Sequence, residues 1–294
     1  MNTLTILVGL PGVGKDNLIR QRKWDISQEI LSSDELRMEL YGNEDQTHNK
    51  EVFQEMNRRV KKAGKLGKSV IYNATNINRG RRVALAQEMK KYFGKINVVV
   101  CVCSIETLLK RNKTREERHL PEDKLRQMIR SFQIPTLYEY HYNDIEYVYT
   151  QKSRPYLMRN SIGALMDYDQ HNECHSEPLG QHILRVADYC KENKKACPAA
   201  LYHDLGKPFC KTVDEEGYYH YIGHPLVSAY MYFIDTVERD FDPEIALLIE
   251  FHDYIFNFNC FEDMKKRLVA KYPELDENFF EALRLLTEGD RLRP

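Results

Sequence analysis

The chain has 294 residues, of which 42% are hydrophobic and 30% are charged, and its formal net charge is −1. This length suits one large or two ordinary domains, and the composition excludes disordered, collagen-like and low-complexity chains. No stretch approaches the ~20 uninterrupted apolar residues of a membrane helix, and the first residues lack secretory-signal features. Seven cysteines without a C-x-x-C pair predict reduced core thiols in a cytoplasmic protein, in the host cytoplasm if a phage encodes it.

The two halves of the chain differ in charge. Residues 1–150 contain 26 Lys and Arg against 19 Asp and Glu, whereas the remaining residues contain 17 against 25. A basic half favours encounter with a polyanion, although solvated charged helices would also explain the difference. This shift, together with the Pro- and Tyr-containing stretch at 151–156, predicts two domains, residues 1–152 and 160–294.

The first half alternates short apolar runs with helical patterns. This alternation, with valine-rich runs, predicts an α/β domain in which a parallel sheet is flanked by helices. The strand candidates are Leu4–Val8, Glu29–Ser32, Ser69–Asn73, Ile96–Cys103 and Ile145–Tyr149, and the clearest helical patterns are Asn49–Ala63, Arg79–Tyr92 and Glu122–Phe132.

The second half is helical in its periodicity, with a short hairpin expected around Gly217. It therefore predicts an all-α domain. The helical patterns are Leu179–Cys190, Ala199–Leu205, Pro225–Val237, Pro243–Phe251 and Asn278–Thr287.

A glycine-rich motif at residues 9–15 follows the first strand candidate and opens a helical pattern. Backbone N–H groups of such a loop surround nucleotide phosphates, and Lys15 reaches the outer phosphates. Asp16 stands where a Ser or Thr hydroxyl normally meets Mg²⁺, and its carboxylate could bind the metal or weaken phosphate binding. The motif predicts ATP, or another NTP, with Mg²⁺, bound by Gly9, Gly12, Val13, Gly14, Lys15 and Asp16.

Two charged motifs follow later strand candidates. Asp34 and Arg37 are three residues apart and share a helix face, so the carboxylate could take a hydroxyl proton while the guanidinium holds a phosphate. An N-cap with a surface arginine is the alternative. Arg111 and Arg115 lie where lid arginines close over a phosphoryl group, and where a solvated charge run would also lie.

Seven of the ten histidines lie between His171 and His252. Imidazole and carboxylate groups gathered from several helices suit one or two divalent transition metals such as Mn²⁺, Ni²⁺, Co²⁺ or Zn²⁺. A carboxylate can bridge two ions, and a water between them becomes a nucleophile near neutral pH. His175 and His220 are weaker candidates. The predicted metal ligands are His182, His203, Asp204, His224, His252 and Asp290.

Five motifs of the first domain, taken in order, resemble the 5′-hydroxyl polynucleotide kinase domain of phage and bacterial end-healing enzymes. The resemblance implies that Asp34 is the general base toward the 5′-OH and that Arg37 grips the acceptor phosphate. It places Arg115, with Arg111, on the transferring phosphate, and Thr75 and Asn76 at the substrate. The motifs are Gly9–Lys15, Ser33–Arg37, Thr75–Arg82, Lys110–Arg115 and Leu120–Arg126.

Two positions depart from this family. Asp16 replaces a hydroxyl residue, and Ala74 stands where these kinases usually carry Asp. Our hypothesis is a relocation: the carboxylate normally found at the strand end is supplied here by Asp16 of the glycine-rich loop, and positions 16 and 74 both flank one Mg²⁺. The alternative is a weak kinase.

The second domain resembles the HD phosphohydrolase superfamily, because His182, His203, Asp204 and Asp290 meet its ligand pattern. A closer likeness, to the HD domain of bacterial tRNA nucleotidyltransferases, implies hydrolysis of phosphomonoesters and 2′,3′-cyclic phosphates at RNA ends. His224 and His252 match the extra histidines of two-metal members, and Lys207 is implied to contact the substrate phosphate. The likeness lies in His175–Val186, Ala200–Pro208 and Gly223–Ala229.

Together the two resemblances imply a bifunctional RNA end-healing enzyme, with RNA or DNA ends as substrates and a separate RNA ligase as partner. It would phosphorylate the 5′-OH and clear the 3′-phosphate or 2′,3′-cyclic phosphate that a ligase cannot use. One alternative is a nucleotide-metabolism enzyme that joins a small-molecule kinase to an HD nucleotidase. The other is a nucleic-acid-binding regulatory protein with a decayed kinase site.

Overall fold

The computed structural model describes residues 1–22, 24, 28–43, 46–115, 119–139, 141–151, 158–171 and 177–292, with the side chains of 158–160 excepted. The chain divides into two compact units. Unit 1 comprises residues 1–122 and 135–150, and unit 2 comprises residues 123–134 and 151–294. The backbone therefore passes from one unit to the other three times.

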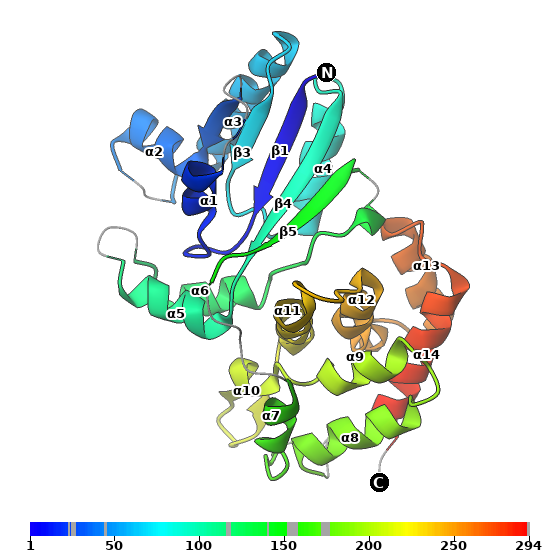
Figure 1. Ribbon diagram of the computed structural model, residues 1–294. Helices are drawn as coiled ribbons and strands as arrows, with labels where there is room; N and C mark the ends of the chain where they lie inside the picture. Colours follow the sequence, from blue (N-terminus) through cyan, green and yellow to red (C-terminus); the bar gives the residue numbers. More distant parts are fainter. Residues whose placement is uncertain are drawn as a thin grey trace. The chain divides into compact units, whose positions relative to one another are not determined.

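Unit 1 is built on a parallel five-stranded sheet with flanking helices, in the strand order β2-β3-β1-β4-β5 (Figure 1). Its elements are β1 (Thr3–Val8), α1 (Lys15–Gln21), β2 (Glu29–Ser32), α2 (Ser33–Tyr41), α3 (Asn49–Lys65), β3 (Val70–Asn73), α4 (Arg79–Met89), β4 (Lys95–Val102), α5 (Ile105–Lys113), the 3₁₀ turn η1 (Leu137–Glu139) and β5 (Asp144–Tyr149).

The central strands of this sheet are buried on both faces. Residues 98–102 of β4 are valines and a cysteine that expose 4% or less, as expected for a parallel strand covered by helices on each side. Helix α3 packs on β2 and β3 through Val52, Met56 and Val60, which recur every four residues, while its charged residues face outward. Because the strands are parallel, the ends of β1, β2 and β3 meet at one edge of the sheet, where the first predicted site begins.

Unit 2 is helical apart from one short hairpin. Helix α8 packs against α9 and α14, and α11 packs against α12. Its elements are α6 (Glu122–Ile129, beginning one residue before the unit), α7 (Met158–Gly163), α8 (Leu179–Tyr189), α9 (Ala196–Tyr202), α10 (Lys207–Cys210), β6 (Thr212–Val213), β7 (Tyr219–His220), α11 (His224–Thr236), α12 (Pro243–Phe251), η2 (Tyr254–Asn257), α13 (Phe261–Lys271) and α14 (Glu277–Arg291).

The apolar stripes of these helices also carry the predicted ligands. In α8 the buried residues Leu179, Ile183 and Val186 lie on the same face as His182. In α14 the buried residues Leu283 and Leu286 lie one to two turns before Asp290. Burial of each stripe therefore directs one ligand toward the interior of the unit.

The predicted secondary structure is confirmed in its elements. All five strand candidates are strands whose ends differ by one residue at most, and the hairpin turns at Gly217, whose φ of 92° favours glycine. Helix α13 was not predicted, because its charged residues obscure the apolar positions Met264 and Leu268.

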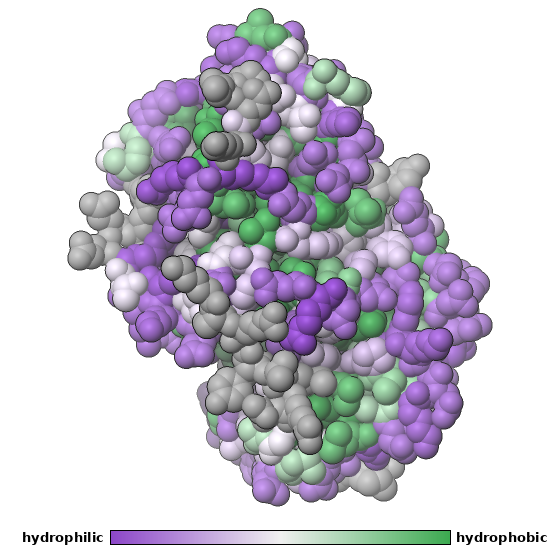
Figure 2. All heavy atoms as spheres, viewed as in Figure 1, coloured by the Kyte–Doolittle hydropathy of each residue, from purple (hydrophilic) through white to green (hydrophobic). Residues whose placement is uncertain are grey.

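Hydrophilic side chains cover most of the face shown in Figure 2, with smaller apolar patches between them. None of the helices in the described part of the chain combines the length and the hydropathy needed to cross a bilayer.

Candidate active sites

The glycine-rich loop forms a cradle between β1 and α1. Gly12 and Gly14 have φ values of 80° and 109°, which side chains with a Cβ rarely adopt, so the loop needs glycine there. The N–H of Gly9 donates to the carbonyl of Thr75 at 2.9 Å, which ties the loop to the segment after β3. The ammonium of Lys15 donates to the carbonyls of Gly9, at 2.8 Å, and Leu10, at 3.2 Å.

The pKa of Lys15 depends on its burial and on charged side chains from other elements of unit 1. Burial lowers the pKa of Lys15, and the nearby Arg115 lowers it further, whereas Cys101, Asp16 and Asp34 act to raise it. Two carboxylates and one guanidinium thus influence the charge of the Lys15 ammonium. A bound polyphosphate would favour the charged form of Lys15 and so offset its burial.

Asp16 reaches the end of β3 from the cradle. Its Oδ1 accepts a hydrogen bond of 3.0 Å from the Asn73 amide, and Asn73 immediately precedes the buried Ala74. The carboxylate of Asp16 therefore lies beside the end of β3, next to Ala74. The kinases that this sequence resembles usually carry an aspartate at the position of Ala74.

Asp34 and Arg37 form an ion pair in the first turns of α2. Nη1 of Arg37 lies 2.7 Å from Oδ1 of Asp34, and Nη2 donates to Oδ1 of Asn49 at 2.6 Å. The Arg37 side chain is only 3% exposed, whereas that of Asp34 is 44% exposed. Nε of Arg37 is buried and has no hydrogen-bond partner within the part of the chain that is described. Asp34 is thus accessible to a substrate hydroxyl while Arg37 is held from two sides.

Arg111 is hydrogen-bonded to the backbone of the cradle. Its guanidinium donates to the carbonyls of Val13, at 2.9 Å, and Thr150, at 2.8 Å, and the Thr150 hydroxyl also donates to Val13. Arg115 lies just beyond α5, with its backbone N–H on the carbonyl of Asn112. The guanidinium of Arg111 thus binds the protein's own backbone, whereas Arg115 influences the charge of Lys15.

Asn76, a predicted substrate-binding residue, is hydrogen-bonded to other residues of unit 1. Asn76 has a φ of 47°, and its side-chain amide donates to the carbonyl of Leu7 at 2.7 Å. Its own carbonyl accepts from the buried Arg82 at 2.9 Å. These contacts hold the loop after β3 against the end of β1 and thereby support the cradle.

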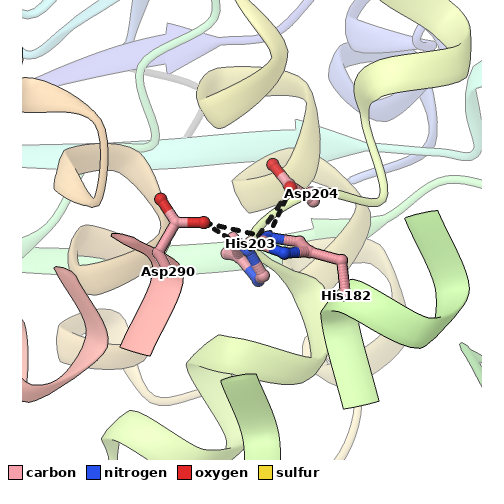
Figure 3. Close-up of side chains that lie close together, drawn as sticks. All are labelled: His182, His203, Asp204 and Asp290. Carbon is pink, nitrogen blue, oxygen red and sulfur yellow. Dashed lines mark hydrogen bonds and ion pairs between the residues drawn. The ribbon is translucent and has the colours of Figure 1, made fainter. Parts of the chain in front are cut away.

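In unit 2, four side chains from α8, the end of α9 and α14 converge on one point (Figure 3). Nε2 of His182 lies 2.9 Å from Oδ1 of Asp290 and 3.3 Å from Oδ2 of Asp204. Nε2 of His203 lies 3.3 Å from the same oxygen of Asp204 and 3.4 Å from Asp290. Such a set of two imidazoles and two carboxylates suits a borderline divalent ion.

Asp204 also belongs to a second ligand group. Its other oxygen, Oδ1, lies 3.0 Å from Nε2 of His224 and 3.7 Å from Nε2 of His252. One carboxylate therefore offers one oxygen to each group, which is the arrangement of a bridging ligand between two metal ions. Glycine at 206 permits this approach, since a Cβ there would lie 2.6 Å from the carbonyl oxygen of His224.

Asp253 is a candidate ligand that the sequence analysis missed. Its two oxygens lie 3.3 Å from Nε2 of His224 and 3.5 Å from Nε2 of His252, and with His252 and Asp290 it forms a third group able to hold a metal ion. The signal was present in the sequence, because His252-Asp253 repeats the adjacent His-Asp pattern of residues 203 and 204.

Backbone carbonyls orient the imidazoles. Nδ1 of His203, His224 and His252 lies 2.6, 2.9 and 2.7 Å from the carbonyl oxygen of the residue three positions earlier. A proton held on Nδ1 by that carbonyl leaves the Nε2 lone pair free for a metal ion. Nδ1 of His182 lies instead 3.2 Å from Glu177 and 3.0 Å from Arg185. These surroundings fit a metal site and are harder to explain for histidines that only fill a core.

The cluster also balances its charges internally. Burial alone would raise the pKa of Asp204, but Lys207 and the nearby histidines hold it well below its usual range. Burial alone would lower the pKa values of His182 and His203, but Asp204 and Asp290 raise each to about 9. Two protonated imidazoles thus accompany the buried carboxylates, and a divalent ion would displace these protons on binding.

Lys207 is fixed at the edge of the cluster. Its ammonium lies 2.6 Å from Oδ2 of Asp204 and donates to Oε1 of the buried Gln170 at 2.9 Å. His220 lies elsewhere, paired with Asp214 on the exposed hairpin at 2.6 Å. His175 lies outside the described residues.

Known proteins match about half of this chain or less. Residues 4–135 match the family model described as an AAA domain. The cradle after β1, in a parallel five-stranded sheet, agrees with this match. The first unit has the sheet and the glycine-rich loop of a P-loop domain.

Several solved structures are similar to this chain. A chain of the Pnkp1/Rnl/Hen1 complex is 24% identical, with a TM-score of 0.35, and a chain of the Pnkp1/Rnl/Hen1 RNA repair complex is 23% identical, with a TM-score of 0.36. The likenesses cover 41% and 43% of this chain and 42% of each of those chains. A sugar kinase from Janibacter is 14% identical, with a TM-score of 0.37, over 51% of this chain and 84% of its own. No curated protein matches the sequence.

In unit 1, Asp16, Asp34 and Arg115 influence the charge of Lys15, while hydrogen bonds tie Arg111 to the cradle and Asn76 to β1. In unit 2 the other five predicted ligands are gathered around Asp204. The side chains that contact these residues but were not predicted as site residues are Asn49, Asn73, Gln170, Glu177 and Asp253.

Proposed function

We propose that this protein is a bifunctional nucleic-acid end-healing enzyme, in which unit 1 phosphorylates 5′-OH ends and unit 2 hydrolyses 3′-phosphate or 2′,3′-cyclic phosphate ends. The observation that carries the proposal is that each unit has its own candidate site, a glycine cradle with Lys15 in unit 1 and a carboxylate shared by two ligand groups in unit 2. RNA ends are the preferred substrate class, because breaks that leave a 5′-OH together with a cyclic phosphate arise in RNA.

In the kinase reaction, Asp34 accepts the proton of the substrate 5′-OH. The 5′-oxygen then forms a bond to the γ-phosphorus of ATP as the bond to the β–γ bridging oxygen breaks, and ADP leaves. Lys15 and Arg115 stabilise the charge that develops on the transferring group. The ion pair with Arg37 orients the Asp34 carboxylate before the proton moves.

Asp16 takes part in this proposal through its position. Mg²⁺ bound beside the polyphosphate would neutralise part of its charge. Asp16, oriented by Asn73 at the end of β3, would hold that ion in place of the aspartate that Ala74 lacks. The relocation hypothesis therefore gains a structural basis, since the two positions adjoin the same strand end.

In the hydrolase reaction, the six histidine and aspartate ligands, with Asp253 beside them, would hold one or two divalent ions such as Mn²⁺, Ni²⁺, Co²⁺ or Zn²⁺. Bound ions of this kind activate water and stabilise both the attacking and the leaving oxygen. Lys207, held between Asp204 and Gln170, would bind the phosphate group of the substrate. The backbone carbonyls behind His203, His224 and His252 would hold the remaining proton on Nδ1 once a metal ion has displaced any proton from Nε2.

The test is an RNA oligonucleotide that carries a 5′-OH and a 2′,3′-cyclic phosphate, incubated with ATP, Mg²⁺ and a panel of divalent metals. Asp34→Asn should abolish 5′ phosphorylation alone, and His203→Ala should abolish 3′-end hydrolysis alone. The matched controls are Glu35→Gln, at an exposed neighbour on α2, and His220→Ala, on the exposed hairpin. Turnover of free nucleotides with both RNA ends left unchanged would instead assign the chain to nucleotide metabolism.

A further inference from the structure

A stacked aromatic pair lies next to the Asp34–Arg37 pair in unit 1. The rings of Tyr41 and His48 are parallel to within 9°, with their centroids 4.1 Å apart. Tyr41 is the last residue of α2, and His48 immediately precedes α3. Tyr41 is half-buried and His48 is exposed, so the stack begins in the protein and ends on an exposed ring.

One hydrogen bond and the spacing along α2 relate this stack to the ion pair. Arg37 donates to Asn49 at 2.6 Å, and Asn49 follows His48 in the chain. Arg37 and Tyr41 are four residues apart, so they occupy neighbouring positions on one face of α2. The two rings therefore lie on the two segments, α2 and the start of α3, that the Arg37–Asn49 hydrogen bond joins.

The spacing along α2 is comparable to the dimensions of one nucleotide. Asp34, Arg37 and Tyr41 stand at i, i+3 and i+7 and share one helix face, with rises of about 4.5 Å and 6 Å between them. A 5′-terminal nucleotide presents its 5′-OH, its 3′-linked phosphate and its base as three groups within comparable distances. Arg37 is 3% exposed and its guanidinium already binds Asp34 and Asn49, so Asp34 is the group of this pair that can meet the hydroxyl; with the 5′-OH at Asp34, the base extends along the helix face toward the ring pair.

We propose that the Tyr41–His48 stack is the platform on which the 5′-terminal nucleobase of the acceptor polynucleotide binds. This inference rests on the proposed kinase function and names the part of the substrate that the machinery around Lys15 does not contact. The base would extend the existing stack on the exposed face of His48. Because every base presents a π-face, this binding would tolerate any terminal base and would select polynucleotides over acceptors without a planar ring.

The test compares His48→Ala with wild-type protein on two 5′-OH oligonucleotides that differ only in whether the terminal nucleotide carries its base or is abasic. On the normal acceptor we expect KM to rise about tenfold, which lies within the range for loss of one stacked base. kcat and the KM for ATP should stay unchanged. On the abasic acceptor the variant and the wild type should have the same KM. His48→Phe, which keeps a planar ring, should restore the low KM, and His220→Ala serves as the distant histidine control.

Two results would overturn the inference. An equal rise in KM on both acceptors would mean that His48 acts only by holding α3 and Arg37 in place. An unchanged KM on the normal acceptor would mean that no base binds there. Equilibrium binding of the same fluorescently labelled oligonucleotides provides a readout without catalysis, and equal affinity of wild type and His48→Ala for the normal acceptor would refute the platform. Failure of the proposed function looks different, because wild-type protein would then phosphorylate neither oligonucleotide.

Discussion

Asp204 gives one oxygen to each of two ligand groups, so replacing it should remove both metal ions at once. His224 belongs only to the group around Oδ1, so His224→Ala should leave the group of His182, His203 and Asp290 able to bind. We therefore expect two ions per chain in the wild type, one in His224→Ala and none in Asp204→Asn.

The size of the effect on stability follows from binding linkage. An ion that binds only the folded state stabilises it by about 2.7 kcal/mol when its free concentration is 100 times Kd, and two such ions contribute about 5 kcal/mol. For a unit of this size, 1 kcal/mol corresponds to a change in Tm of about 2–4 °C. Excess metal should therefore raise the Tm of unit 2 by about 10–20 °C in the wild type and by about half as much in His224→Ala.

The assay is elemental analysis of desalted protein, together with thermal unfolding before and after treatment with a chelator. Asp188→Asn, at an exposed position of α8, is the matched control and should behave as the wild type does. Circular dichroism at low temperature establishes that each variant is folded. If folded Asp204→Asn retains one ion, or if chelation leaves the wild-type Tm unchanged, then the interpretation of Asp204 as a bridging ligand is wrong.

Three further outcomes are expected in unit 1. If Asp16 has taken over metal binding, kinase activity lost in Asp16→Ser should recover when Ala74→Asp is added; no recovery, measured as ATP-dependent labelling of 5′ ends, would disprove the relocation. Glu139→Ala should lower the free energy of unfolding by about 3–5 kcal/mol, because it leaves the buried Arg82 guanidinium, 2.5 Å from Glu139, without its counter-charge; chemical denaturation measures this, and Glu139→Gln should cost less. Hydrogen bonds from neighbouring arginines lower the pKa of Glu55 from 4.5 to about 2, so its contribution is present above pH 4.5 and is lost as the pH falls toward 2; Glu55→Gln should cost about 1 kcal/mol at pH 7, given solvent screening, and nothing near pH 2.

Local patterns predicted the elements of this protein well. Alternating valine-rich runs identified the strands of unit 1, since a parallel strand buried on both faces must be apolar along its length. The glycines at 12 and 14 indicated the cradle because few other residues adopt its φ values. Helical periodicity located α8 and α14 and placed His182 and Asp290 on their buried faces.

The sequence also contained signals that were harder to separate from background. The pair His252-Asp253 repeats the pattern of His203-Asp204, yet an acidic residue beside a histidine is common on protein surfaces. Only packing shows that both oxygens of Asp253 face the ring nitrogens of His224 and His252. Chain order likewise suggests that α6 belongs with the strands around it, whereas Arg126 lies 4.7 Å from the Phe209 ring and Phe132 contacts Tyr230 within unit 2.

The sequence by itself thus determined the α/β and all-α character of the two halves, the cradle and the residue types of both sites, because these follow from hydrophobic period, glycine conformation and ligand chemistry over short spans. The tertiary structure alone decided that Asp204 offers its two oxygens to separate ligand groups, that Arg111 braces the cradle and that Tyr41 stacks on His48. Each of these contacts joins side chains on different elements or across a turn, and its geometry depends on how whole helices and strands pack, which no local pattern in the chain encodes.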